Sequence, residues 1–414
     1  MSALGNRDFR RLWLAGLVSD TGDWLLLVSL PILVYQLTGS TLGTAYAFLV
    51  ELAAAVLLAP LAGVLADRLD RRRLLVVVSL AQAVALVPLA AWPRLPVVYA
   101  VIAAQAALAS LFDPAKNALL PTLVGAEDLM SANSLVGLNQ NLGRLIGGPL
   151  GGLLLAAGDL RAIVAADAAS FLVTALLLVG LPRRPLSRPT SPPAPDRGRT
   201  GRPFTRPAVR AGLLVAVVAS VAQGLFAVLF VVFVARALHG DAGETGLLRG
   251  VQAIGAVAGG LLLAAPGRTG PGRLPPGLLV GVSCLLFGAL SLVTWNGPRL
   301  TTAPGPYLAL FIAVGVPGVA IVTGLTTVLQ QSTVDGQRGR VFAALGVAVA
   351  AGQALGMLAG GLLGDRLGVV TVLNGQAVVY LLAGVLALAA LARVRPSVPV
   401  PDTTAPPEPV HSGR

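Results

Sequence analysis

The sequence contains few of the residues that build soluble active sites. Of its 414 residues only 12% are charged and 5% are aromatic, and it has one cysteine and two histidines. The single cysteine, Cys284, excludes an internal disulfide or a CxxC redox pair. The two histidines, His239 and His411, cannot form a histidine metal cluster, and no G-x-x-x-x-G-K-[ST] phosphate loop occurs. These shortages argue against an enzyme, a metal site, a cofactor and ATP hydrolysis.

Apolar residues and glycine are abundant instead. Apolar residues make up 55% of the chain, its mean hydropathy is +0.81, and it has 49 glycines. A bilayer core needs roughly 20 apolar residues per helical crossing, and many glycines with few aromatics favour packed helices over a β-barrel. The sequence therefore predicts an all-α integral membrane protein with twelve transmembrane helices. These predicted spans are residues 12–35, 42–66, 73–92, 96–113, 129–157, 160–181, 211–236, 246–265, 277–296, 306–330, 340–363 and 369–393.

The net charge of +12 reflects topology rather than a nucleic-acid-binding face. Of the 30 basic residues, 23 lie in the N-terminal segment, in every second connection and in the C-terminal segment, and only 6 lie in the remaining connections. Basic loops stay on the cytoplasmic side of a membrane. We therefore expect a multi-pass protein of the cell inner (plasma) membrane with both termini in the cytoplasm.

The chain divides into two halves. Residues 182–210 are rich in proline and arginine and predict a cytoplasmic linker between six-helix halves at 1–181 and 211–394, while residues 395–414 predict a disordered tail. A shift of 209 positions also aligns glycines of the fifth span with those of the eleventh: Gly137 with Gly346, Gly143 with Gly352, Gly147 with Gly356, Gly151 with Gly360, and Gly152 with Gly361. The two halves are therefore expected to be pseudo-symmetric repeats, as in many secondary transporters.

The connection between the second and third spans carries a family motif. It reads G-V-L-A-D-R-L-D-R-R-R and resembles the major facilitator superfamily signature G-x-L-a-D-r-x-G-r-[RK]. The matching residues are Gly63, Leu65, Asp67, Arg68, Arg71 and Arg72. Asp70 departs from the signature, because the family has glycine there. The resemblance covers the whole chain and implies the major facilitator fold.

The resemblance also implies a latch that closes the cytoplasmic gate. Gly63 is expected to permit the close approach of a neighbouring helix, and Asp67 to lock to basic groups or to an opposing helix N-terminus. Asp113, at the end of the fourth span, is expected to pair with one of Arg71 to Arg73. The corresponding connection of the second half, residues 267–274, has no acidic residue.

The fifth span combines glycines with polar residues. Its Gly148-Pro149-x-x-Gly152 element resembles a signature of superfamily exporters, although Arg144 stands where a glycine is expected. Helical spacing places Gly137, Asn141, Arg144 and Gly148 on one stripe. Such a stripe suits either a helix that moves beside a transport cavity or a tight packing seam without a transport role.

Four shorter stretches point to a branch of the superfamily. Residues 6–24, 113–124, 129–135 and 330–342 look like the opening segment and the cytoplasmic connections of macrolide-efflux transporters. That branch also includes siderophore exporters and lysophospholipid transporters. The resemblance therefore names a subfamily better than it names a substrate.

Three charged residues are predicted to lie near the bilayer midplane. Counting along the helices places Asp23 about 18 Å, Glu51 about 15 Å and Arg144 about 20 Å from the nearest span end, where a charge needs a partner, water or a function. Asp20 lies one turn below Asp23 on the same face. The carboxyl groups and Arg144 are candidates for proton coupling or substrate binding, and Glu51 could instead form a structural pair with Arg144.

The remaining polar residues of the spans are assigned lesser roles. Asp167 is six residues beyond Arg161 in a peripheral helix, which favours a structural role. The second half is expected to contribute only neutral polar groups, so that the ionised chemistry is confined to the first half. The candidate cavity-lining residues, each of which could instead form a helix–helix hydrogen bond, are Asn141, Gln223, Gln252 and Gln353.

Together these features predict a secondary active transporter. We expect proton-coupled efflux of amphipathic or cationic small molecules, of macrolide or multidrug type, by alternating access of a monomer. The proton gradient is the expected energy source, since no cofactor is expected. A siderophore exporter or lysophospholipid transporter on the same fold is the alternative, and a transport-inactive scaffold or receptor is an alternative of another class.

Overall fold

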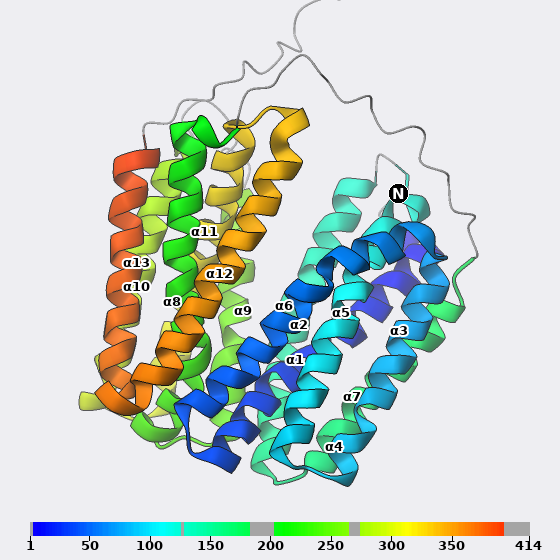
Figure 1. Cartoon of the computed structure of the whole chain (residues 1–414), viewed down its shortest axis with the longest axis horizontal. Helices are drawn as coiled ribbons and strands as arrows, with labels where there is room; N and C mark the ends of the chain where they lie inside the picture. Colours follow the sequence, from blue (N-terminus) through cyan, green and yellow to red (C-terminus); the bar gives the residue numbers. More distant parts are fainter. Residues whose placement is uncertain (1–2, 126–127, 183–202, 265–273, 393–414) are drawn as a thin grey trace, which may run out of the picture.

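The computed structural model describes residues 3–125, 128–182, 203–264 and 274–392, which form helices joined by short turns (Figure 1). The helices of the first half are α1 (Arg7–Thr38), α2 (Thr41–Arg68), α3 (Arg71–Ala85), α4 (Val87–Ala91), α5 (Leu95–Leu123), α6 (Leu129–Ala156) and α7 (Leu160–Val179). Those of the second half are α8 (Pro207–Ala237), α9 (Ala242–Ala264), α10 (Pro276–Asn296), α11 (Pro304–Gln331), α12 (Asp335–Leu367) and α13 (Val369–Leu391). Three short 3-10 helices complete the set: η1 (Ala3–Gly5), η2 (Pro203–Thr205) and η3 (Gly297–Arg299).

These helices make the twelve predicted crossings. Helices α3 and α4 form one crossing that is interrupted at Leu86, where Pro88 in the first turn of α4 lacks a backbone donor. Eleven crossings in the described part of the chain are apolar enough to span a bilayer by composition alone. The twelfth is α6, whose 28 residues are long enough but include Arg144 and several amides. The all-α, twelve-span fold is confirmed.

Some helices run further than their apolar runs. The predicted fourth span ends at residue 113, but α5 continues to Leu123, so the expected connection 113–124 is helical. Likewise α12 begins at Asp335, inside the expected connection 330–342. Polar residues were assigned to loops in both places, whereas Lys116 is buried within α5 and its neighbours pack on α1 and α3. The predicted linker core 183–202 and the tail 395–414 lie outside the described residues.

Local caps set the turn between α1 and α2. Gly39 ends α1 with φ +62°, a left-handed conformation that glycine adopts without steric cost, and its amide donates to the carbonyl of Tyr35. Ser40 then begins α2, and its hydroxyl accepts from the amides of Leu42 and Gly43. This turn lies at the end of the bundle opposite the start of α1 and the end of α13 (Figure 1).

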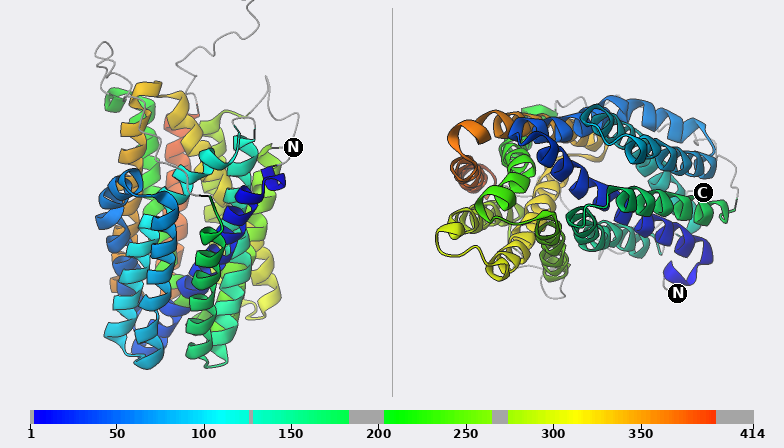
Figure 2. Two further views of the ribbon diagram at one scale, coloured as in Figure 1. Left: turned by 90° about the vertical axis from the view of Figure 1, so that its right-hand side faces the viewer. Right: turned by 90° about the horizontal axis from the view of Figure 1, so that it is seen from below.

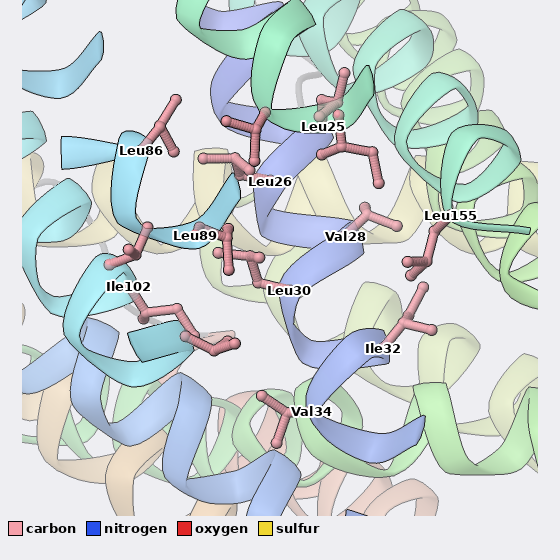
Figure 3. Close-up of a cluster of buried hydrophobic side chains, with 14 of the residues drawn as sticks. Leu25, Leu26, Val28, Leu30, Ile32, Val34, Leu86, Leu89, Ile102 and Leu155 are labelled. Atoms are coloured by element: carbon pink, nitrogen blue, oxygen red, sulfur yellow. The ribbon is translucent and has the colours of Figure 1, made fainter. Parts of the chain in front are cut away.

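A layer of aliphatic side chains packs the first half around α1. In lipid, helices associate through close packing rather than through exclusion from water. Figure 3 shows α1 at the centre of this cluster, with side chains from α3, α4, α5 and α6 meeting it. Its labelled members are Leu25, Leu26, Val28, Leu30, Ile32, Val34, Leu86, Leu89, Ile102 and Leu155. The cluster holds α1 at the centre of the first half.

The two halves meet most closely along α6 and α9. Gly148 and Gly152 of α6 lie against the backbone of Gly246 and Gly250 of α9. A Cβ atom on Gly152 would stand 2.3 Å from the carbonyl oxygen of Ala242, so only glycine allows this approach. The other face of α6 packs on α1, where a Cβ on Gly147 would stand 2.1 Å from the carbonyl oxygen of Thr21.

A second contact between the halves joins α2 to α12. A Cβ on Gly361 would lie 2.6 Å from the Cβ of Ala45, next to a small apolar cluster of Ala45, Val228 and Met357. Both contacts involve helix ends on one face of the bundle. We call the face that holds the start of α1 and the end of α13 the termini face, and the opposite face, where these contacts lie, the far face. Figure 1 shows the two halves together at this face, at the bottom, and further apart at the termini face. Figure 2 shows the halves side by side when the far face is viewed directly.

The α6–α9 contact makes a direct prediction for stability. Gly152→Ala should lower the apparent Tm of the purified protein, because the new Cβ overlaps the Ala242 carbonyl and overpacking costs about 1–3 kcal/mol. Gly137→Ala in the same helix is the matched control, since its Cβ would meet nothing within 4 Å. Thermal unfolding followed by size-exclusion recovery measures both, and equal midpoints would contradict the proposed packing.

Candidate functional site between the two halves

A cavity of about 190 Å³ lies among α1, α2 and α5. Most of its wall is apolar, with Leu27 and Pro31 among the residues of α1 that line it. Three polar side chains also face it, from Asp23, Glu51 and Gln105. The structure therefore brings together two of the predicted candidates, Asp23 and Glu51, as the depth count predicts.

Two arginines meet beside this cavity, one from each half. Arg144 of α6 donates from Nε to the backbone carbonyl of Arg249 in α9, at 3.0 Å. The guanidinium carbons of Arg144 and Arg249 lie 5.2 Å and 5.9 Å from the ring centre of Trp24, and that of Arg249 lies 4.9 Å from the Phe226 ring. Cation–π contacts of this kind are stronger where water is excluded.

The expectation that ionised groups are confined to the first half is wrong. Arg249 lies seven residues after the first residue of α9, about 10 Å into the helix, and its charge interacts with that of Glu51. Residue 249 lies inside the predicted span 246–265, but the charge count assigned Arg249 to the weakly basic connection before that span. The alternative pairing of Glu51 with Arg144 is also wrong, because Arg144 turns to Arg249.

Asp20 belongs to a different group of charges, nearer the termini face. Lys116 places Nζ 2.9 Å from Asp113 Oδ1 and 4.0 Å from Asp20 Oδ1, and it lies over the Phe112 ring. The Lys116 side chain is only 7% exposed, so its carboxylate partners matter. Asp20 was predicted to extend the path from Asp23, but its nearest cation is this lysine, which the sequence analysis had placed in a loop.

Most of the neutral candidates form helix contacts. Gln223 accepts a hydrogen bond from the Tyr380 hydroxyl at 3.3 Å, and Asn141 donates to a backbone carbonyl of its own helix. Gln252 lies near Arg249 Nη1, at 3.5 Å, and lines a cavity of about 10 Å³ with aromatic residues. Gln353 is half-buried in α12. None of the four is among the residues that line the larger cavity; Gln252 lines the smaller one, and Gln223 forms the helix–helix hydrogen bond that was the alternative.

Comparison with known proteins identifies the family. The family model of the Major Facilitator Superfamily matches residues 12–334 and 212–412. The chain belongs to the Major Facilitator Superfamily. It is 29% identical over 375 residues, 85% of each chain, to the uncharacterized MFS-type transporter YfiS of Bacillus subtilis (strain 168). It is 31% identical over 192 residues, 45% of each chain, to the enterobactin exporter EntS of Salmonella choleraesuis (strain SC-B67).

Solved structures of other superfamily transporters share the fold. A bacterial homologue of the iron transporter ferroportin, in an inward-facing state, matches with a TM-score of 0.70 and 19% identity over 94% of this chain and 99% of that one. A bacterial homologue of the human lysosomal transporter Spinster matches with a TM-score of 0.69 and 14% identity over 93% and 96%. These likenesses support the fold, and the family match together with the apolar helices makes the chain a multi-pass superfamily transporter.

The superfamily motif covers the end of α2 and the start of α3, and its side chains have different partners from those expected. Asp113 pairs with Lys116 rather than with an arginine of the motif, because α5 continues and puts the lysine one turn away. Arg71 donates to the carbonyl of Ala118 at 2.9 Å, and Arg72 donates to the carbonyl of Leu178 at 3.3 Å and to that of Val179. These bonds attach the motif to the ends of α5 and α7.

The other motif residues are described only in part. A Cβ on Gly63 would meet nothing within 4 Å, so the expected close helix approach is wrong for this conformation. Asp70 replaces the family glycine by capping α3, with its side chain accepting from the Arg73 amide. Arg68 is exposed at the end of α2. The position of the Asp67 side chain lies outside what the structure describes.

An ion-paired lock joins the halves at the far face. Arg236 of α8 bonds to Asp365 of α12 at 2.9 Å, to the Tyr35 hydroxyl at 2.6 Å and to the Gly39 carbonyl at 2.9 Å. Asp365 also accepts from the amide and the hydroxyl of Thr41, at 3.0 Å and 2.8 Å. Tyr35, Gly39 and Thr41 belong to the first half, so one arginine and one carboxylate hold the turn between α1 and α2 to the second half.

The far-face lock can be tested by cysteine labelling. In a Cys284→Ser background, Ala45→Cys marks a fully buried position of the interface between α2 and α12. Asp365→Asn should raise the rate of maleimide labelling at position 45 about tenfold, because the charged bond and the cap on α2 are both weakened. Asp159→Asn, which changes a helix cap away from the interface, is the control. An unchanged rate would show that the lock does not hold this face closed.

The buried lysine also makes a prediction. Lys116→Met should lower stability by about 3 kcal/mol, because it leaves Asp20 in a largely buried site without its cation. Adding Asp20→Asn should restore much of the loss. Apparent Tm values of the two single variants and the double variant measure the coupling between Lys116 and Asp20. Simple additivity of the two effects would show that the two side chains do not stabilise each other.

Proposed function

We propose that this transporter exports amphipathic small molecules from the cytoplasm, driven by the proton gradient. The observation that carries the proposal is the apolar cavity of about 190 Å³ with the carboxyl groups of Asp23 and Glu51 in its wall. Apolar walls accept varied shapes, while a few charged groups orient a ligand. All of the residues that line it belong to the first half, and Leu27 connects it to the smaller cavity that both halves line.

The two carboxyl groups are proposed to couple transport to protons. A carboxyl group that meets water in one conformation and an apolar wall in another can exchange a proton as the conformation alternates. Asp23 and Glu51 come from α1 and α2 of the same half. Helix α1 also contacts α6, α8 and α9, so movement at Asp23 is transmitted to both halves.

The arrangement of the halves supports an inward-facing conformation. Basic residues favour a cytoplasmic termini face, and the close contacts between halves lie at the far face, at Gly152 and Asp365. With that orientation, the described conformation admits substrate from the cytoplasm. The far-face contacts would then have to break for release, which is the alternating access expected of the superfamily.

Two substrate classes are proposed for the same cavity. The relation to enterobactin exporters over 45% of the chain favours a siderophore-like molecule, and a lysophospholipid rests on the sequence resemblance of the branch. The macrolide or multidrug reading rests on the sequence resemblance of the branch and on the apolar wall. A transport-inactive scaffold would show binding without coupled flux.

The proposal is tested by accumulation in efflux-deficient cells that express the chain. Ethidium, a macrolide and a tricatecholate siderophore serve as probes, each with and without an uncoupler. At least one probe should accumulate less than in empty-vector cells, and the uncoupler, Glu51→Gln or Asp23→Asn should each remove that difference, because coupling needs a titrating carboxyl.

Glu244→Gln is the matched control, since it makes the same chemical change in the first turn of α9, outside the cavity. Protein levels are compared in membranes. Unchanged accumulation of every probe at normal expression would contradict export of these classes, and export that survives the uncoupler would contradict proton coupling.

A further inference from the structure

We infer that Arg144 and Arg249 form an anion-binding subsite of the transport path, selective for amphipathic molecules that carry a carboxylate, phosphate, sulfonate or ionised catechol. The inference rests on the proposed function and names the charge of its substrate. Asp23 and Glu51 alone would favour a cation. The two arginines, one from each half, reverse that preference at the junction beside the cavity.

The charge around the arginines favours an anionic ligand. An arginine side chain stays protonated in proteins, and a charge within a membrane-spanning segment is costly without a partner. Among the described residues, no carboxylate lies within 4.0 Å of Arg144 or of Arg249. The two guanidinium groups therefore lack a close counter-ion.

Most hydrogen-bond donors of the two guanidinium groups are unused. Arg144 donates from Nε to the carbonyl of Arg249, and its two terminal nitrogens make no hydrogen bond to the described residues. Within the same part of the chain, the Arg249 side chain makes one long bond, 3.5 Å, from Nη1 to Gln252 Oε1. A guanidinium offers five donors in a planar fork that matches carboxylate and phosphate oxygens. Trp24 holds both forks on one ring and so prepares them for a shared anion.

Apolar cavities beside the arginines can take the apolar part of the ligand. Trp24 and Leu27 line the cavity of about 190 Å³. Leu27 also lines a second cavity of about 40 Å³, together with Arg249, Phe48 and Phe230. Arg249 thus lines the smaller cavity, while Trp24, whose ring both guanidinium groups contact, lines the larger one. An amphipathic anion can place its charged group at the two arginines and its body along Trp24 and Leu27.

Glu51 then acts as an internal counter-ion that competes with the substrate for Arg249. Neutralising Glu51 should strengthen anion binding, while ionised Glu51 should promote release. The other charged or titratable groups around the two arginines are Asp23 on α1 and Tyr380 on α13. Asp23 interacts with the acids and lysine of the first half, Asp20, Asp113, Asp167 and Lys116. Glu51 is therefore the carboxyl that the inference assigns to this exchange.

Binding of matched probes to the full chain tests the inference. The purified protein in phosphatidylcholine nanodiscs is titrated by calorimetry with 2-naphthoate and with 2-naphthylmethylammonium, which share one ring system and differ in charge. 2-Naphthoate should bind roughly tenfold more tightly. Arg144→Gln and Arg249→Gln should each weaken its binding roughly tenfold, and Glu51→Gln should strengthen it several-fold. Arg94→Gln, at an exposed turn, should change nothing.

Further variants and a flux assay keep the outcomes separate. Arg249→Lys retains the positive charge and should recover part of the binding if Arg249→Gln acts through charge, while size-exclusion profiles report folding. Tighter binding of the cation, or equal binding by Arg249→Gln and Arg94→Gln, would overturn the inference. Anion binding without proton-driven flux in vesicles would instead contradict the proposed function, and flux of cations without anion binding would contradict the inference alone.

Discussion

The close contact between α6 and α9 is the constraint on which the site depends. Glycines at Gly148, Gly152, Gly246 and Gly250 let two backbones approach without intervening side chains. This approach brings Arg144 within hydrogen-bonding distance of the Arg249 carbonyl. With larger residues at the seam, the helices would separate and the two arginines could not share Trp24. The position of the two charges at the junction therefore depends on the glycine packing of α6 and α9.

The same contact explains why the junction is suited to switching. Glycine seams allow helices to slide because they present no interlocking side chains. On the far face, the contact is supplemented by the specific bonds of Arg236 and Asp365, which are directional and exposed to solvent. The glycine contact lets α6 and α9 slide, and the bonds of Arg236 and Asp365 can form or break. The two halves therefore have two discrete arrangements, one with these bonds formed and one with them broken. Bistability of this kind is what alternating access requires.

Hydropathy and helical geometry predicted the fold and two of the site residues. Twelve apolar runs fix twelve crossings because lipid leaves the backbone no other way to satisfy its hydrogen bonds. A count at 1.5 Å per residue then placed Asp23 and Glu51 at similar depth, and they share a cavity. Such predictions succeed because the depth of a residue in a transmembrane helix depends on the local chain alone.

The remaining site residues depended on information that a single sequence does not carry. Arg249 was counted with the weakly basic connection before its helix, although residue 249 lies inside the predicted span 246–265 and α9 begins at Ala242. Lys116 was placed in a loop because α5 continues through two prolines, which local propensity disfavours. The partners of α6 could not be read from its glycines, since a small residue permits contact on any side. Rotation of a helix about its axis is set by tertiary packing.

The central claim is that the two halves move against each other about this junction. Spin-label pairs in a Cys284→Ser background measure it by pulsed electron resonance, with one pair at Met130 and Leu261 on the termini face and another at Gly158 and Asp241 on the far face. Addition of a transported probe in nanodiscs should shorten the first distance and lengthen the second. Two distances that both stay unchanged, or that both change in the same direction, would contradict alternating access in this protein.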